Sequence, residues 1–304
     1  MNKYSIGDLE RLSGIKAHTI RMWERRYGVI DPGRTQTNIR YYNEDDLLRI
    51  LNISILKQIG YRISKIANLS NEDLKNYVLT NIIESDNPEV QIETLVVALF
   101  SIDEYRFLKV LNSSIEKNGI EYTFEKVVFP FIDRLGLMCD KGIINQIQRR
   151  FIFNLIRQKL SASIDDLEVK NTKERQRRII FFMPSMEWGE VNLLYYSLIA
   201  RVEGFEVLYL GTSIELDSLG SICNIQDDDV LFFSVNSECT DDEINKVVPF
   251  LNENYQPSLK IISGINVPQK LETLKERLSN SRVVDSAGSF RKVVGSWKED
   301  DSHG

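Results

Sequence analysis

The sequence predicts a multidomain α and α/β protein: an N-terminal winged helix-turn-helix, a central helical bundle and a C-terminal doubly wound parallel sheet of the Rossmann or flavodoxin-like kind. Two short amphipathic segments joined by a glycine turn precede a basic hairpin. Long stretches with helical spacing of apolar residues follow, and then apolar runs alternate with helical segments. We expect domains at 1–70, 71–168 and 178–297, a polar linker at 169–177 and a disordered tail at 298–304.

The charge is distributed unevenly along the 304 residues. Residues 1–70 contain 12 Lys and Arg against 7 Asp and Glu, a net charge of +5, so the remainder carries −11 of the total of −6. A basic head on an acidic body is typical of a small nucleic-acid-binding domain joined to a body that does not bind nucleic acid. No apolar run approaches the roughly 20 residues that span a bilayer, and the N-terminus lacks a signal pattern. We therefore expect a cytoplasmic protein with no membrane partner.

Cysteine and histidine are too few and too scattered to form a catalytic or metal cluster. The three cysteines are Cys139, Cys223 and Cys239, and the two histidines, His18 and His303, lie at opposite ends of the chain. Neither a disulfide framework nor a zinc site has this spacing. We expect no metal and no histidine-based catalysis.

The N-terminal segment has the order helix, turn, helix, hairpin. Ser5 suits the N-cap of a first helix, Ser13-Gly14 ends that helix, and a second helix is expected at 16–27. Asp31-Pro32-Gly33 signals a turn, and a short strand at 39–42 completes a hairpin, called here the wing. In this motif the second helix enters the major groove of DNA.

Several short motifs of this segment resemble the DNA-binding domain of the MerR family. They are T-I-R-x-W-E-R-R-Y-G from Thr19, P-x-R-T from Pro32, and R-x-Y-x-x-x-D from Arg40, within a match over roughly residues 3–69. The W-E-R-R-Y-G form is similar to the CarH/LitR branch of light- or cobalamin-responsive repressors. The resemblance implies a homodimer or tetramer that binds double-stranded promoter DNA. This branch favours repression, and activation, as in many MerR members, is the alternative.

The resemblance assigns DNA contacts to polar and basic side chains on two elements. Those on the second helix would reach base edges and phosphates, and those on the wing and its strand would hold the phosphate backbone. These residues are His18, Thr19, Arg21, Arg25, Arg34, Arg40 and Tyr42. A solvated surface position is an equal alternative for His18 and for the neighbouring Arg26, and Trp23 is expected in the core.

The middle of the chain is similar to the helical cap beside a cobalamin-binding domain. The likeness lies in the stretch 136–142 and in the helix that follows it. Cys139 stands where that family has Trp, and Arg149-Arg150 stand where it has Glu-His. The groups that would cover the upper face of cobalamin are therefore replaced.

The C-terminal segment is similar to the cobalamin-binding Rossmann-like domain itself. Where that family has D-x-H-x-x-G, Pro184 holds the Asp position, Met186 holds the position of the cobalt-ligating His, and Gly189 matches. Ser234 and Ser263-Gly264 partly match later elements of the family. Because residues 19–302 contain no histidine, a histidine-ligated cobalamin is excluded, and we expect no cofactor.

Two other function classes stay open. A sensor that still binds cobalamin, or another small molecule, would need base-on binding or Met186 as a weak ligand. An enzyme would need a nucleophile, a base or a metal set, and the acidic run 227–229 is expected in a solvated turn instead. A pocket for an unknown ligand or a protein partner would have at its rim Ser185, Glu187, Trp188 and Ser234.

Overall fold

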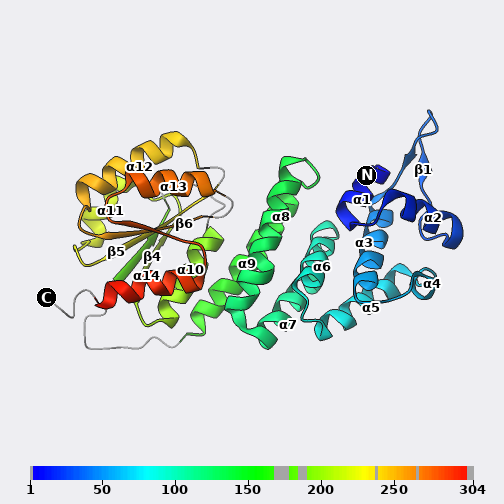
Figure 1. Ribbon diagram of the computed structural model, residues 1–304, viewed down its shortest axis with the longest axis horizontal. Coiled ribbons are helices and arrows are strands. Elements are labelled where there is room, and N and C mark those ends of the chain that lie inside the picture. The colour runs from blue at the N-terminus through cyan, green and yellow to red at the C-terminus, as the bar shows by residue number, and fades with distance from the viewer. Residues whose placement is uncertain (1–2, 168–177, 184–189, 237–238, 265–266, 300–304) are drawn as a thin grey trace. The chain divides into compact units, whose positions relative to one another are not determined.

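A computed structural model describes residues 3–167, 178–183, 190–236, 239–264 and 267–299. They belong to two compact units, Met1–Ile152 and Phe153–Gly304 (Figure 1). The first unit contains one hairpin of β1 (Gly33–Arg34) and β2 (Arg40–Tyr41), and otherwise helices. The helices are α1 (Ile6–Ser13), α2 (Ala17–Tyr27), α3 (Glu44–Gln58), α4 (Ile63–Ile66), α5 (Asn71–Glu84), α6 (Pro88–Phe100), α7 (Glu104–Thr123), α8 (Phe129–Asp140) and the start of α9 (Gln146–Asp165).

Side-chain caps fix where the first helices begin. Ser5 and Asp8 form a capping box at α1, and Asn43 and Asp46 form another at α3. In each box the side chains satisfy backbone N–H groups that have no partner within the helix. Gly14 ends α1 with φ of 69°, a left-handed conformation that glycine adopts without steric cost. The predicted order of helix, glycine turn and helix is confirmed.

Helix α3 is the centre of the first unit. Its buried apolar side chains, among them Leu47, Ile50 and Leu51, lie against α1, α5 and α6. A second link comes from Arg134 on α8, which donates from Nη2 to the Leu12 carbonyl at 3.0 Å and pairs with Glu93. The helix-turn-helix is therefore packed continuously onto the helices that follow it.

Helices α5 to α8 and the start of α9 lie in the first unit, where a helical bundle is expected. Asn87 caps α6 by accepting from the Glu89 N–H, and Gly119 takes a non-helical φ of 83° inside α7. A π-helical turn, Phe124–Val128, joins α7 to α8. Pro130 has no N–H to give to an α-helical hydrogen bond, and the wider turn lies just before it.

The second unit contains a five-stranded parallel sheet in the order β4-β3-β5-β6-β7. The strands are β3 (Arg178–Phe182), β4 (Glu206–Gly211), β5 (Val230–Val235), β6 (Leu259–Gly264) and β7 (Ser281–Val284). The helices between and after them are α10 (Glu190–Val202), α11 (Leu216–Cys223), α12 (Asp241–Asn254), α13 (Pro268–Arg277) and α14 (Ala287–Glu299). This is the flavodoxin-like strand order, so the predicted doubly wound sheet is confirmed.

Helices cover both faces of the sheet, as Figure 1 shows, with α10 and α14 on one face and α11 to α13 on the other. Buried strands explain the continuous apolar runs of the sequence. Phe181 and Phe232 stack with ring centres 4.7 Å apart beneath α10. The disordered tail predicted from 298 is corrected for 298 and 299, because α14 continues to Glu299. The predicted linker at 169–177 and residues 300–304 lie outside the described residues.

Candidate DNA-binding surface

The second helix presents its basic residues outward. Apolar Ile20 and Trp23 are buried beneath α2, which confirms the prediction for Trp23, while Arg21 and Arg25 on the other side are exposed. Within the described residues, their guanidinium groups make one hydrogen bond, from Arg25 Nε to the Arg21 carbonyl at 3.5 Å. Both guanidinium groups are therefore accessible to a partner with acceptor atoms.

The N-terminal end of α2 is held by α1 rather than by its own cap. The Ala17 N–H donates to Glu10 Oε2 at 3.2 Å, and Lys16 pairs with the same carboxylate. These contacts lower the pKa of Glu10, first through the hydrogen bond from Ala17. His18 is exposed and Thr19 is half-buried on the first turn, the part of a recognition helix that meets base edges.

The wing is a two-stranded antiparallel hairpin in which Gly33 pairs with Tyr41 and Arg34 pairs with Arg40. Arg34 Nη1 donates to Asn38 Oδ1 at 2.6 Å, which closes the loop. Asn38 has φ of 62°, a left-handed conformation that asparagine tolerates better than most residues. The next residue, Ile39, is 65% exposed.

Glu24 ties the wing to the recognition helix. It accepts from Arg40 Nε at 3.3 Å and from the Tyr42 hydroxyl at 3.5 Å. Arg40 stays half-exposed, so its remaining N–H groups can reach a phosphate while Glu24 fixes the side chain. The role of Glu24 is missing from the sequence prediction, although its place inside the arginine-rich helix is a usable signal.

Tyr42 requires a correction. Its side chain is completely buried, and its backbone pairs with that of Tyr4. Burial, followed by the charge of Glu24, raises the pKa of its hydroxyl. Tyr42 therefore supports the surface from within instead of contacting DNA. Six of the seven predicted contact residues remain on the surface formed by α2 and the wing: His18, Thr19, Arg21, Arg25, Arg34 and Arg40.

The second unit has its polar groups inside, at the carboxyl ends of β5 and β6. Asn192 on α10 donates from Nδ2 to Ser234 Oγ and to Ser263 Oγ, both at 3.0 Å, and all three residues are buried. The nearby hollow beside Ser234 and Cys239 measures about 10 Å³, roughly one water molecule. Among the described residues, Ser234 therefore does not open onto a ligand-sized pocket.

The positions that replace cobalamin-binding groups are placed only in part. Cys139 and Arg149 are half-buried and Arg150 is exposed, each on the helices α8 and α9. Pro184, Met186 and Gly189 lie outside the described residues, as do Ser185, Glu187 and Trp188. In the acidic run, Asp227 and Asp228 lie exposed in a turn, as predicted. The prediction is wrong for Asp229, which is buried and pairs with Arg178 at 2.5 Å.

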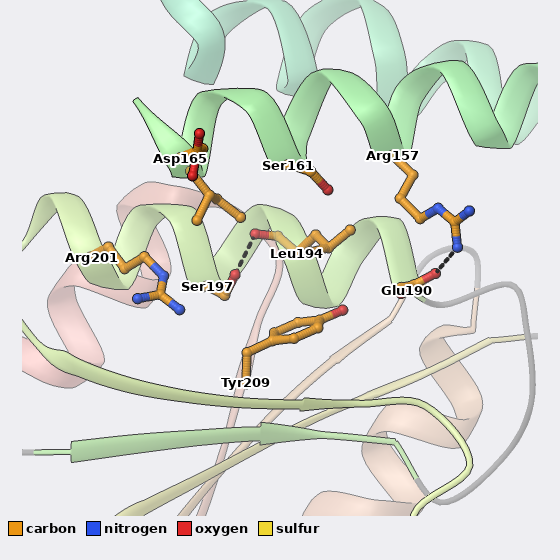
Figure 2. A pocket seen from close by; sticks show the side chains of 9 residues that line it. Arg157, Ser161, Asp165, Glu190, Leu194, Ser197, Arg201 and Tyr209 are labelled. Atoms are coloured by element: carbon orange, nitrogen blue, oxygen red, sulfur yellow. Dashed lines mark hydrogen bonds and ion pairs between the residues drawn. The ribbon is translucent and has the colours of Figure 1, made fainter. Parts of the chain in front are cut away.

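A larger hollow of about 450 Å³ lies beside α10 in the second unit (Figure 2). At one end Arg157 donates to Glu190 at 3.4 Å, and Tyr209 lies below them. Burial raises the pKa of Tyr209, so its hydroxyl stays protonated. Within the described ranges, the Tyr209 hydroxyl and Arg201 Nε are buried without a hydrogen-bond partner. The hollow thus contains two unused donors.

Neither a metal-binding cluster nor a membrane-spanning helix occurs in the described part of the chain. It contains no group of three or more His, Cys, Asp or Glu side chains placed to hold a metal ion. None of its helices is both long enough and apolar enough to cross a bilayer.

Comparison with known proteins places the surface of α2 and the wing in a family. Residues 4–73 match the model of the MerR HTH family regulatory proteins. The chain is 26% identical to the HTH-type transcriptional repressor CarH of Myxococcus xanthus, over 79% of this chain and 81% of that repressor. It is 22% identical to the repressor CarA of the same organism, over 97% and 96% of the two chains.

Among solved structures, the monomethylamine corrinoid protein of Methanosarcina barkeri aligns with 74% of this chain and 98% of its own, at 14% identity and a TM-score of 0.41. The sequence matches place the family likeness at the N-terminal end and extend the relationship along most of the chain. Residues 4–73 therefore form a MerR-type helix-turn-helix domain, in a protein homologous to the CarH and CarA repressors.

Proposed function

We propose that this protein is a DNA-binding transcriptional regulator that represses promoters through the surface of α2 and the wing. The observation that carries the proposal is the pair Arg21 and Arg25, exposed on the recognition helix of a MerR-type domain. Arginine binds guanine edges and phosphates through two parallel hydrogen bonds, and neither residue has a carboxylate partner among the described residues. The names of the relatives, transcriptional repressors, support repression as the sign of control.

The regulator would act as a homodimer or a higher oligomer. Helix-turn-helix proteins commonly read two half-sites related by two-fold symmetry, and a symmetric pair of chains matches such a site. A regulatory role is also better supported than an enzymatic one. The acidic run that could suggest catalysis contains Asp229, whose carboxylate is used by the buried pair with Arg178.

The body of this regulator would not hold cobalamin through a histidine. Residues 19–302 lack histidine, so the cobalt-ligating group of the resembling family has no equivalent. In addition, Asn192 uses its amide to bridge Ser234 and Ser263, two residues that the family likeness had marked for a ligand. These residues do not fit the group, and we assign it no part in the function. Protein incubated with cobalamin and then desalted should be colourless, and a red fraction would refute this part of the proposal.

DNA binding is tested by retention of promoter fragments selected from genomic DNA, measured at several salt concentrations. Binding should weaken steeply with salt because phosphate contacts release counterions. Arg21→Ala should weaken retention by about 10- to 100-fold, since a good bidentate contact contributes about 1–3 kcal/mol. Arg40→Ala should weaken it less specifically, across all fragments. Salt-insensitive retention, or retention unchanged by both substitutions, would refute DNA binding by this surface.

A further inference from the structure

A hollow of about 540 Å³ lies in the first unit where α3, α5 and α7 meet. Three cationic side chains line it, one from each of these helices: Arg49, Lys75 and Arg106. Against them stands one half-buried carboxylate, that of Asp103. The two other acidic residues of the lining, Asp45 and Glu72, are exposed at the rim. The inner part of the hollow is therefore positively charged.

Arg106 is the most unusual member of this group, because its side chain is only 2% exposed. Nη1 donates to Asn52 Oδ1 at 3.0 Å, but Nε is buried without a hydrogen-bond partner among the described residues. The nearest carboxylate oxygen, on Asp103, is 4.0 Å from Nε. Burial lowers the pKa of Arg106 to about 10, yet the group stays charged at neutral pH. A buried cation with an unused donor is costly unless another acceptor approaches.

Asp103 cannot neutralise Arg106 alone, because it is already shared. Its Oδ2 pairs with Lys75 Nζ at 2.5 Å, and its Oδ1 caps α7 by accepting from the Arg106 N–H at 3.0 Å. Burial by itself raises the pKa of Asp103, but the hydrogen bond from Lys75 and the bond from the Arg106 backbone lower it overall. The carboxylate is thus ionised and fully engaged, and an excess of positive charge remains.

Apolar side chains line part of the hollow, beside the uncharged polar residues Asn52, Asn71, Asn76 and Ser101. Leu79 and Val97 are buried at its wall, and Leu48 is half-buried. Tyr105 is 64% exposed at the rim, although a tyrosine ring gains from contact with an apolar or aromatic partner. Mostly apolar walls with a few converging polar groups are typical of small-molecule sites, and 540 Å³ lies within their usual size.

We propose that this hollow binds a small organic anion, whose carboxylate or phosphate is held by Lys75 and Arg106 and whose apolar part lies on Leu79 and Val97. The oxyanion would give the guanidinium group of Arg106 the acceptor that it lacks and would add a second partner for Lys75. A neutral ligand would leave the excess positive charge unpaired. The rim residue Tyr105 would cover the apolar part.

The bound anion controls DNA binding through Arg49, and this step rests on the proposed function. Arg49 lines the hollow and also holds the end of the DNA-reading region: Nε donates to the Val29 carbonyl, just after α2, at 2.6 Å. Its Nη2 donates to the carbonyls of Ala67 and Leu69 at 2.7 and 2.9 Å. An anion that draws this guanidinium toward the hollow weakens the support of α2. Ligand and DNA then oppose each other, and by linkage each weakens the binding of the other by the same factor.

Calorimetric titration of the full chain with inorganic phosphate and with benzoate tests the site, in the millimolar range. Saturable binding of at least one probe is expected, and the stronger probe identifies phosphate or carboxylate as the preferred group. Lys75→Met should weaken that binding by about tenfold through loss of one charge-assisted contact. Arg106→Met should weaken it at least as much; if that variant does not fold, Lys75→Met decides.

Arg201→Met is the matched control, because Arg201 also lines a hollow with a buried, unpartnered Nε, in the second unit (Figure 2). It should bind the probes as the unchanged chain does. Absence of saturable binding, equal binding by Lys75→Met, or loss of binding only in Arg201→Met would each overturn the site.

DNA retention measured without any probe keeps this test separate from that of the proposed function. If retention fails, the proposed function fails while the calorimetric result still stands. With DNA binding established, a saturating amount of the better probe should weaken retention by the unchanged chain and not by Lys75→Met. Unchanged retention would overturn the control through Arg49.

Discussion

On α2, Arg21 and Arg25 are exposed, whereas at the strand ends of the second unit Asn192, Ser234 and Ser263 are buried and bond to one another. Only the first region leaves its polar groups available to an external partner. A charged side chain without an internal partner can bind an external one at little cost. A buried amide that already serves two hydroxyls would have to break those bonds first. Available donors therefore distinguish the proposed DNA-binding surface from the buried polar cluster of the second unit.

The largest expected effect comes from removing both arginines of the recognition helix. Arg21→Ala with Arg25→Ala should reduce DNA affinity by about 2–6 kcal/mol, since each bidentate contact contributes about 1–3 kcal/mol. Thermal stability should change little because both side chains are exposed. Fluorescence anisotropy with a selected DNA site measures the affinity. Arg26→Ala is the control, because Arg26 lies over the Tyr27 ring, 5.2 Å from its centre. An equal loss in the control would mean that net charge alone determines binding.

Removing the buried hydrogen bonds of the second unit should have the opposite result: stability should fall, and DNA affinity should not change. Asn192→Leu leaves two buried hydroxyls without their donor, and we expect a loss of about 2–4 kcal/mol in the free energy of unfolding, with DNA affinity unchanged. Adding Ser234→Ala and Ser263→Ala should restore much of that stability, because replacing all polar partners by apolar groups is nearly neutral. Urea unfolding measures both steps. A stable single variant would show that Asn192 leaves room for a ligand after all.

In contrast to the exposed arginines of α2, one cation of the second unit is buried and already has internal partners. Lys260 is fully buried, and its ammonium donates to the carbonyls of Tyr255, Gln256 and Ser258. Burial lowers the pKa of Lys260 to about 8, below the ordinary value of 10.5. The folded state then binds this proton less tightly than the unfolded state. This contribution to stability is therefore complete above pH 10.5 and is lost as the pH falls through 8.

The rise in the free energy of unfolding with pH is at most about 3 kcal/mol. The carbonyl groups that stabilise the ammonium make it smaller. Urea unfolding between pH 7.5 and 10.5 should show a rise that Lys260→Met lacks. Lys246→Met on α12 is the control, because Lys246 is exposed. Parallel pH profiles of the unchanged chain and Lys260→Met would contradict the lowered pKa.

Local pattern was sufficient to predict the elements of the fold. Alternation of apolar runs with helical segments predicted the sheet, and the strand expected at 281–284 coincides with β7. Capping residues and glycine turns placed α1 and α3, because these signals act over three or four residues. The π-helical turn was missed, since its hydrogen bonds depend on how the helix adapts before Pro130.

The candidate site was predicted less completely, because burial depends on residues distant in the chain. Arg21 and Arg25 follow from helical spacing alone. The position of Tyr42 depends on Glu24, 18 residues earlier, and that of Arg106 on Asn52, 54 residues earlier. Spacing within one helix contains no information about such partners. The hollow around Arg106 was therefore beyond the reach of the sequence prediction, although its residues are ordinary members of a bundle.

Tyr42→Phe should have the smallest effect, and it tests whether the Tyr42 hydroxyl supports the surface from within or contacts DNA. The hydroxyl lies 3.5 Å from Glu24 Oε2, near the limit of a hydrogen bond, so its removal should cost at most about 0.5 kcal/mol of stability. DNA affinity should stay within about twofold, because the buried ring remains in place and Arg40 keeps its bond to Glu24. Anisotropy measurements alongside Arg40→Ala provide the comparison. A loss of tenfold or more in Tyr42→Phe would mean that this hydroxyl turns outward to bind phosphate in the complex, and that α2 and the wing move apart when DNA binds.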